Sequence, residues 1–185
     1  DSEGRVLVTF PNGEARNITA GPSSEISKAV IEVFSPLFLH IPAVLWLSTS
    51  DAKVQYTDDG LALKMGLKIR ADQNLPDIIL ADLGPSDPLI LFIEVVATDG
   101  AITDRRKEAI YQLTDEAGYK REQIAFLTAY QDRQKPGFKK TISGLAWNSF
   151  AWFMSEPDKI VYFKDGVEKI SELLKRRNPD LSLDE

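Results

Sequence analysis

The sequence predicts an α/β fold in which helices flank one mixed central β-sheet. Two apolar runs, 75–80 and 89–96, are short, rich in β-branched residues and bounded by Pro, Gly and Asp, which is typical of buried strands. The link between them, 82–88, is short and turn-rich, so the two strands are expected to be antiparallel neighbours. A helical segment over 103–117 precedes the next apolar run, 123–128, which is therefore expected to lie parallel to the second strand.

The rest of the chain supplies the outer elements of this sheet. Residues 5–10 alternate between polar and apolar types and end at a Pro-Asn-Gly turn, which predicts a strand or an edge hairpin. A helix is expected to begin at an N-cap on Ser23 or Ser24 and to run to about residue 39, with Pro36 near its last turn. The other expected elements are strands over 42–47, 53–56 and 160–163 and helices over 58–65, 139–150 and 167–177.

Composition excludes several kinds of chemistry. A length of 185 residues, with 43% hydrophobic residues, suits a single domain over 1–185. The chain has no Cys, which excludes disulfides, zinc–thiolate sites and Cys nucleophiles and fits a cytoplasmic protein. It has one His, His40, at an apolar helix end, so sites that need two His are excluded and a structural role is favoured. No signal peptide is expected.

Two acidic residues stand out in the paired apolar runs. Asp77 lies at the edge of the first strand and Glu94 lies inside the second. A buried carboxylate costs several kcal/mol unless it is neutralised, and two on neighbouring strands also repel each other. A shared divalent cation such as Mg²⁺ would neutralise both and would activate water for hydrolysis. The alternative is that Asp77 caps a turn and Glu94 faces solvent on an edge strand.

The combined pattern resembles the catalytic domain of the BsuBI/PstI-type type II restriction endonucleases, within the PD-(D/E)XK nuclease superfamily. The resemblance spans roughly residues 23–163, and its motifs are LPDIIL (75–80), FIEVV (92–96), DGAI (99–102), TAYQDR (128–133), FKK (138–140) and AW (146–147), with VIE (30–32) and Lys53. It implies a restriction-endonuclease-like core and a magnesium-dependent enzyme that cuts double-stranded DNA at a short palindrome, as a homodimer. It also implies that the family's N-terminal helical recognition domain is absent from this chain.

One position departs from the superfamily pattern, which has Lys two residues after the second acid where this chain has Val96. A positive group there would hold hydroxide and offset the charge of the transition state. The nearest source is the basic start of the following helix, where Lys107 is the candidate replacement and Arg106 a candidate phosphate clamp. The alternative is that these residues form a solvated first turn of the helix.

Further charged residues are candidates for metal or DNA contact. Glu32, in the first helix, is a candidate third metal ligand or a surface residue. The candidates for contact with the DNA backbone are Arg105, Arg133, Lys139, Lys140 and Lys53, and the alternative for each is a solvated surface charge.

Two other functions remain open at this level. Val96 favours a catalytically inactive DNA-binding or regulatory module that keeps the nuclease fold. The net charge of −6 favours a protein-interaction module, because a basic field over the whole surface is missing.

Overall fold

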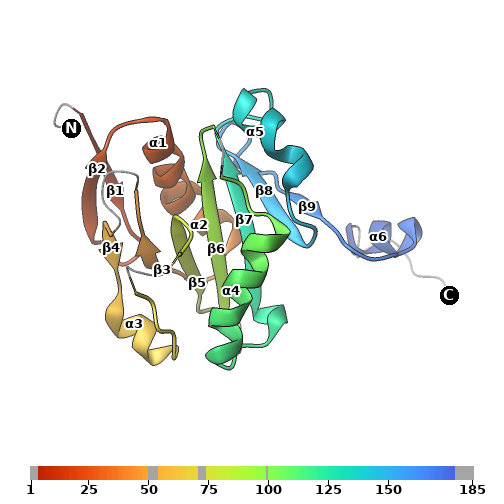
Figure 1. Cartoon of the computed structure of the whole chain (residues 1–185), viewed down its shortest axis with the longest axis horizontal. Helices are drawn as coiled ribbons and strands as arrows, with labels where there is room; N and C mark the ends of the chain where they lie inside the picture. The colour runs from red at the N-terminus through yellow and green to blue at the C-terminus, as the bar shows by residue number, and fades with distance from the viewer. Residues whose placement is uncertain (1–3, 50–53, 71–73, 99, 178–185) are drawn as a thin grey trace.

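The computed structural model describes residues 4–49, 54–70, 74–98 and 100–177. Its centre is a seven-stranded mixed sheet in the order β4-β3-β5-β6-β7-β8-β9 (Figure 1). The strands are β3 (Pro42–Leu47), β4 (Tyr56–Thr57), β5 (Ile78–Asp82), β6 (Leu89–Val96), β7 (Ile124–Tyr130), β8 (Ser149–Phe153) and β9 (Val161–Phe163). β5 and β6 pair antiparallel, whereas β6, β7 and β8 run parallel. The predicted mixed α/β fold is thus confirmed.

Helices cover both faces of this sheet, as the two hydrophobic cores show. On one face lie α1 (Pro22–Ala29), a π-helical turn η1 (Val30–Phe34) and α2 (Ser35–Phe38), which follow one another without a break. The hairpin of β1 (Arg5–Thr9) and β2 (Ala15–Thr19) packs beside them. On the other face lie α3 (Asp59–Lys64) and α4 (Asp104–Glu116), which crosses in front of β6 and β7 in Figure 1.

The π-helical turn changes which side chains of the first helix face the core. An even 3.6-residue period would bury Val33 and Leu37, but both are exposed, while Ile31 and Phe34 are buried. A π turn adds a residue to the turn and rotates all later side chains around the helix axis. The helix also continues through Pro36.

The region after β7 differs most from the prediction. A helix over 139–150 is expected from the sequence, but α5 ends early (Pro136–Thr141) and is followed by a 3₁₀ turn, η3 (Ile142–Gly144). Asn148 then takes a positive φ of 59°, which a helix does not allow, and β8 begins at the next residue. The aromatic-rich stretch SFAWF fits a buried strand beside β7 better than a helix.

Two short helices complete the fold. A 3₁₀ turn, η2 (Arg121–Gln123), leads into β7. The helix α6 (Ile170–Arg177) projects away from the main body beyond β9 (Figure 1). In the described part of the chain, no helix has the length and apolar character needed to cross a bilayer.

Candidate active site

Asp77 lies directly before β5, and three contacts fix the short segment that carries it. Its carbonyl oxygen accepts a 2.8 Å hydrogen bond from the Ser48 backbone at the end of β3. The indole of Trp46 donates to the Pro76 carbonyl over 3.1 Å. Asp77 Oδ2 itself accepts from the Val95 N–H of β6 at 2.8 Å. The Val95 N–H therefore holds the carboxylate against β6, while the Ser48 N–H after β3 holds the backbone of Asp77.

Glu94 lies opposite this position on β6. The antiparallel register pairs Ile78 with Ile93, so the preceding Asp77 falls beside Glu94. The side chain of Glu94 is only 15% exposed, although every neighbour on its strand is apolar. The structure thus brings the two predicted acidic residues together at one end of adjoining strands.

Arg106 reaches this pair from the first turn of α4. The Thr103 hydroxyl caps that helix by accepting from the Arg106 N–H, which aims the turn at the sheet. Arg106 Nη2 lies 3.4 Å from Glu94 Oε1, and Nη1 donates to the Asn74 carbonyl over 2.8 Å. The third donor, Nε, is buried and has no partner within the described residues. The guanidinium therefore joins the segment before β5 to Glu94 and keeps one donor free.

Burial raises the pKa of both acids, and the charge of Asp77 raises that of Glu94 further. Burial raises the pKa of Asp77, although the Val95 N–H and the charge of Arg106 act in the opposite direction. Burial, followed by the charge of Asp77, raises the pKa of Glu94 to about 7, against the lowering effects of Arg106 and the Asp77 N–H. Two carboxyls with raised pKa values in one place are typical of a functional site.

These residues fit a hard divalent cation. Carboxylate oxygens are the ligands that Mg²⁺ prefers, and it is usually held by one or two carboxylates together with water and substrate phosphate. A bound cation would offset both the burial and the repulsion by Asp77 that raise the pKa of Glu94. No group of three or more His, Cys, Asp or Glu that could hold a metal occurs among the described residues, so the protein ligands on offer here are Asp77 and Glu94.

Lys107, the candidate replacement for the missing lysine, does not join this pair. Its side chain is buried, its Nζ donates to the Trp147 carbonyl over 2.7 Å, and it lies 5.6 Å from the Phe126 ring centre. Val96, at the position of the missing lysine, is itself buried in an aromatic cluster with Phe153. The positive charge that the structure places at the acidic pair is that of Arg106.

Glu32 is also held elsewhere. Its Oε2 accepts from the Thr9 N–H at 2.8 Å and forms an ion pair with Lys28 at 3.0 Å. It therefore fastens the β1–β2 hairpin to the first helix, and the structure does not bring it together with Asp77 and Glu94.

The basic candidates divide into paired and unpaired side chains. Arg133 makes a two-pronged ion pair with Glu156, at 2.6 and 3.0 Å. Lys139 and Lys140 on α5 and Arg105 on α4 are exposed, and no ion pair or hydrogen bond of their side chains occurs within the described ranges. α5 packs closely on the segment after β6, so its two lysines lie near the end of the sheet that carries Glu94. Lys53 lies outside the described residues.

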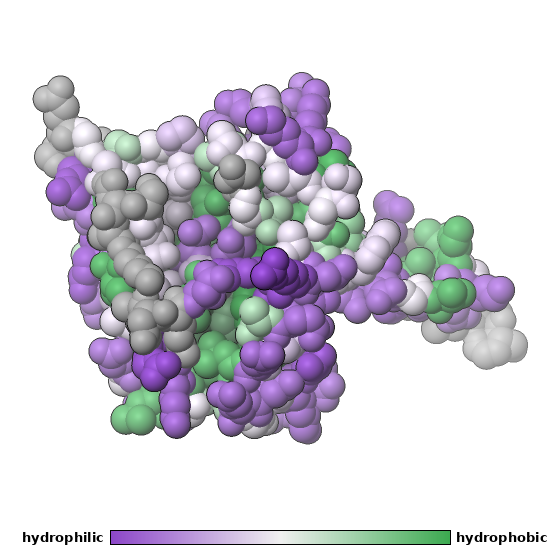
Figure 2. Space-filling model, viewed as in Figure 1, coloured by the Kyte–Doolittle hydropathy of each residue, from purple (hydrophilic) through white to green (hydrophobic). Residues whose placement is uncertain are grey.

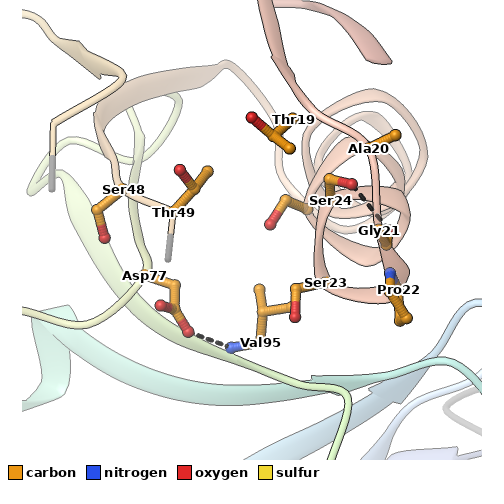
Figure 3. A pocket seen from close by; sticks show the side chains of 11 residues that line it. Thr19, Ala20, Gly21, Pro22, Ser23, Ser24, Ser48, Thr49, Asp77 and Val95 are labelled. Carbon is orange, nitrogen blue, oxygen red and sulfur yellow. Dashed lines mark hydrogen bonds between the residues drawn. The ribbon is translucent and has the colours of Figure 1, made fainter. Parts of the chain in front are cut away.

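A cavity beside Asp77 was not expected from the sequence. It has a volume of about 310 Å³ and lies between the start of α1 and the ends of β3 and β6 (Figure 3). The expected N-cap at Ser23 or Ser24 is wrong: α1 begins at Pro22 with no side-chain cap. The signal in the sequence was the run of serines at 23, 24 and 27, whose hydroxyls line the cavity instead.

Comparisons with known proteins show which sequences and folds this chain resembles. The family model described as "BsuBI/PstI restriction endonuclease domain" matches residues 6–166. The chain is 24% identical over 163 residues to the type II restriction enzyme BsuBI of Bacillus subtilis, covering 87% of this chain and 49% of that protein. It is 25% identical over 166 residues to the type II restriction enzyme AplI of Arthrospira platensis, covering 86% and 49%. The solved structure of SdaI restriction endonuclease shares the fold, with a TM-score of 0.77 and 18% identity over 90% of this chain and 51% of that one. The chain thus spans about half the length of these proteins.

Proposed function

Because the chain belongs to the BsuBI/PstI restriction endonuclease domain family, we propose that it is the nuclease domain of a magnesium-dependent type II restriction endonuclease. The substrate is double-stranded DNA, and the reaction is hydrolysis of one phosphodiester bond in each strand of a short palindromic site. The observation that supports this best is the pair of partly buried carboxylates, Asp77 and Glu94, beside the partly unpaired guanidinium of Arg106.

The roles follow from the chemistry of each side chain. Asp77 and Glu94 would hold Mg²⁺, which, when bound, polarises a phosphoryl oxygen and lowers the pKa of water. The Val95 N–H fixes one oxygen of Asp77 and so orients the carboxylate. Arg106 positions Glu94, and its positive charge beside the acidic pair would offset negative charge that develops in the transition state.

Basic side chains near this end of the sheet would hold the DNA backbone. The exposed lysines of α5 and Arg105 at the start of α4 are the candidates, and Figure 2 shows that the surface over α5 is hydrophilic. Two cuts at a palindrome need two active sites related by a twofold axis, so we propose that the protein acts as a homodimer. We also propose that it acts in the cytoplasm.

Cleavage of supercoiled plasmid in Mg²⁺ tests this proposal. Asp77→Asn and Glu94→Gln should each slow cleavage at least about 100-fold. Asp87→Asn is the matched control, because Asp87 is exposed in the loop that joins the same two strands. If the unmodified protein and all three variants cut at the same rate, the assignment of the acidic pair is wrong.

The second candidate function is a DNA-binding module that does not cut. The buried Val96, which leaves no lysine at the superfamily position, favours it. This alternative predicts that the unmodified chain binds duplex DNA, with an affinity that falls as salt rises, but produces no nicks in Mg²⁺ or Mn²⁺.

A further inference from the structure

The cavity beside Asp77 is lined mainly by small residues, many of which carry a hydroxyl. Six hydroxyl-bearing residues from three separate segments surround it, with Asp77 in the wall (Figure 3). They are Thr19 at the end of β2, Ser23, Ser24 and Ser27 on α1, and Ser48 and Thr49 after β3. No Lys or Arg is among the described residues that line it, so any anion bound there would be held by neutral donors.

Backbone donors of α1 are free at this cavity. The helix starts at Pro22 without a side-chain cap, and the Ser24 hydroxyl turns back to donate to the Gly21 carbonyl over 2.8 Å. The backbone N–H groups of Ser23 and Ser24 consequently have no partner within the described part of the protein. Uncapped N–H groups and the positive end of the helix dipole together favour an anion.

Ser27 provides a second and independent observation. It lies one turn further along α1, is 3% exposed and lines the cavity, yet its hydroxyl makes no hydrogen bond to any described residue. The Ser27 oxygen is not among the buried unpaired side-chain atoms of the described residues, so it opens onto the cavity, where a bound group can be its partner. Ser35, on the same continuous helix, shows the ordinary solution, since its buried hydroxyl donates to the Ile31 carbonyl over 2.6 Å.

We propose that this cavity binds a backbone phosphate of the cleaved DNA strand, next to the phosphate that is hydrolysed. Donors without positive charge, arranged around a free helix start, suit the oxygens of a phosphate. The cavity shares Asp77 with the acidic pair, so a phosphate in it would lie beside the reacting one. This inference rests on the proposed function in one respect: a cation on Asp77 must cancel its repulsion of the phosphate.

Thymidine 3′,5′-bisphosphate is a suitable probe, because it carries two phosphates with the spacing of a DNA strand and needs no particular target sequence. The full chain is titrated and followed by NMR of its backbone amides, once in Ca²⁺ and once in EDTA. In Ca²⁺, the amide signals of Ser23, Ser24 and Ser27 should shift. Shifts that leave residues 23–27 unaffected, or no binding, would overturn the inference.

Substitutions make the test specific to the cavity. Ser27→Ala should weaken binding of the bisphosphate three- to tenfold, and Ser23→Ala, at an exposed position, about two- to threefold. Ser35→Ala is the matched control and should leave the affinity unchanged. If Ser27→Ala and Ser23→Ala both bind as tightly as the unmodified protein, the cavity is not the phosphate site.

The phosphate site and the cation on Asp77 can be tested separately. Binding that shifts residues 23–27 equally in Ca²⁺ and EDTA would retain the phosphate site but contradict a cation on Asp77. Inorganic phosphate alone should bind at least tenfold more weakly than the bisphosphate. If it binds as tightly, the cavity holds a free anion rather than a DNA strand.

Discussion

The guanidinium of Arg106 lies 3.4 Å from Glu94, while its neighbour Lys107 donates to the backbone carbonyl of Trp147, just before β8. Two adjacent residues of one helical turn therefore have different roles. Arg106 reaches the end of the sheet where the acids meet, and Lys107 joins α4 to the segment before β8. Both are largely buried, and the direction of each side chain decides its role.

This relationship predicts unequal effects of two neighbouring substitutions. Arg106→Met should slow cleavage about 100-fold, because it removes the positive charge beside the acidic pair and the partner of Glu94. Lys107→Met should lower the free energy of unfolding by about 1–3 kcal/mol, because it leaves the Trp147 carbonyl unpaired, but should change the cleavage rate only a few-fold. Single-turnover cleavage and denaturant unfolding separate the two. A larger loss of rate in Lys107→Met than in Arg106→Met would return Lys107 to the catalytic site.

The raised pKa of Glu94 predicts that the metal-free protein is less stable at alkaline pH. The carboxyl has an ordinary pKa of 4.5, against about 7 in the folded protein. Between these values the folded state binds more protons than the unfolded state, so the contribution of Glu94 to stability is complete below pH 4.5 and is lost as pH rises to about 7. Glu94→Gln should then stabilise the protein by roughly 3 kcal/mol at pH 8 and change little at pH 4. Urea unfolding in EDTA measures this, and a stability difference that does not vary with pH would contradict it.

Glu32 offers a test between a structural and a metal-binding role. Glu32→Gln weakens the ion pair with Lys28 and the bond from the Thr9 N–H, so unfolding should become easier by about 1 kcal/mol. Calorimetric titration with Mn²⁺ should give the same affinity as the unmodified protein, whereas Asp77→Asn should lose binding. Weakened Mn²⁺ binding in Glu32→Gln would place Glu32 among the ligands after all.

The elements that the sequence predicted well are those with a strong local pattern. β5 and β6 are continuous apolar runs joined by a turn-rich loop, so their pairing, and with it the meeting of Asp77 and Glu94, followed from the sequence. The helix over 103–117 has regular spacing and a Thr cap, and its presence makes β7 parallel to β6.

The elements that it predicted poorly depend on tertiary contacts. β8 is short, and it is a strand because its aromatic residues pack beside β7, a contact that local spacing does not reveal. The π turn in the first helix shifts Val33 and Leu37 to the surface without any local marker. The direction of Lys107 depends on the Trp147 carbonyl, which is 40 positions away along the chain.

The lysines of α5 predict a specific change in the salt dependence of DNA binding. Lys139 and Lys140 are exposed and unpaired among the described residues, so each is free to displace a counterion from a phosphate. Replacing both with Ala should reduce the slope of log K against log salt by about 2. Lys159→Ala is the control, because Lys159 already pairs with Asp158. Fluorescence anisotropy in the presence of Ca²⁺ measures the slopes. Equal slopes for the unmodified protein, the double variant and Lys159→Ala would exclude α5 from the DNA interface.

The close approach of α5 to the sheet leads to the last prediction. A Cβ on Gly137 would lie 2.6 Å from the Ala97 carbonyl oxygen just after β6, and backbone cannot give way as a flexible side chain would. Gly137→Ala should therefore push α5 away from the end of β6 and destabilise the fold by about 1–3 kcal/mol. Gly144→Ala is the matched control, because a Cβ there meets nothing within 4 Å. If α5 carries DNA-binding lysines, Gly137→Ala should also lower the salt slope, whereas Gly144→Ala should not. A Gly137→Ala protein with unchanged stability would show that α5 is not anchored by this contact.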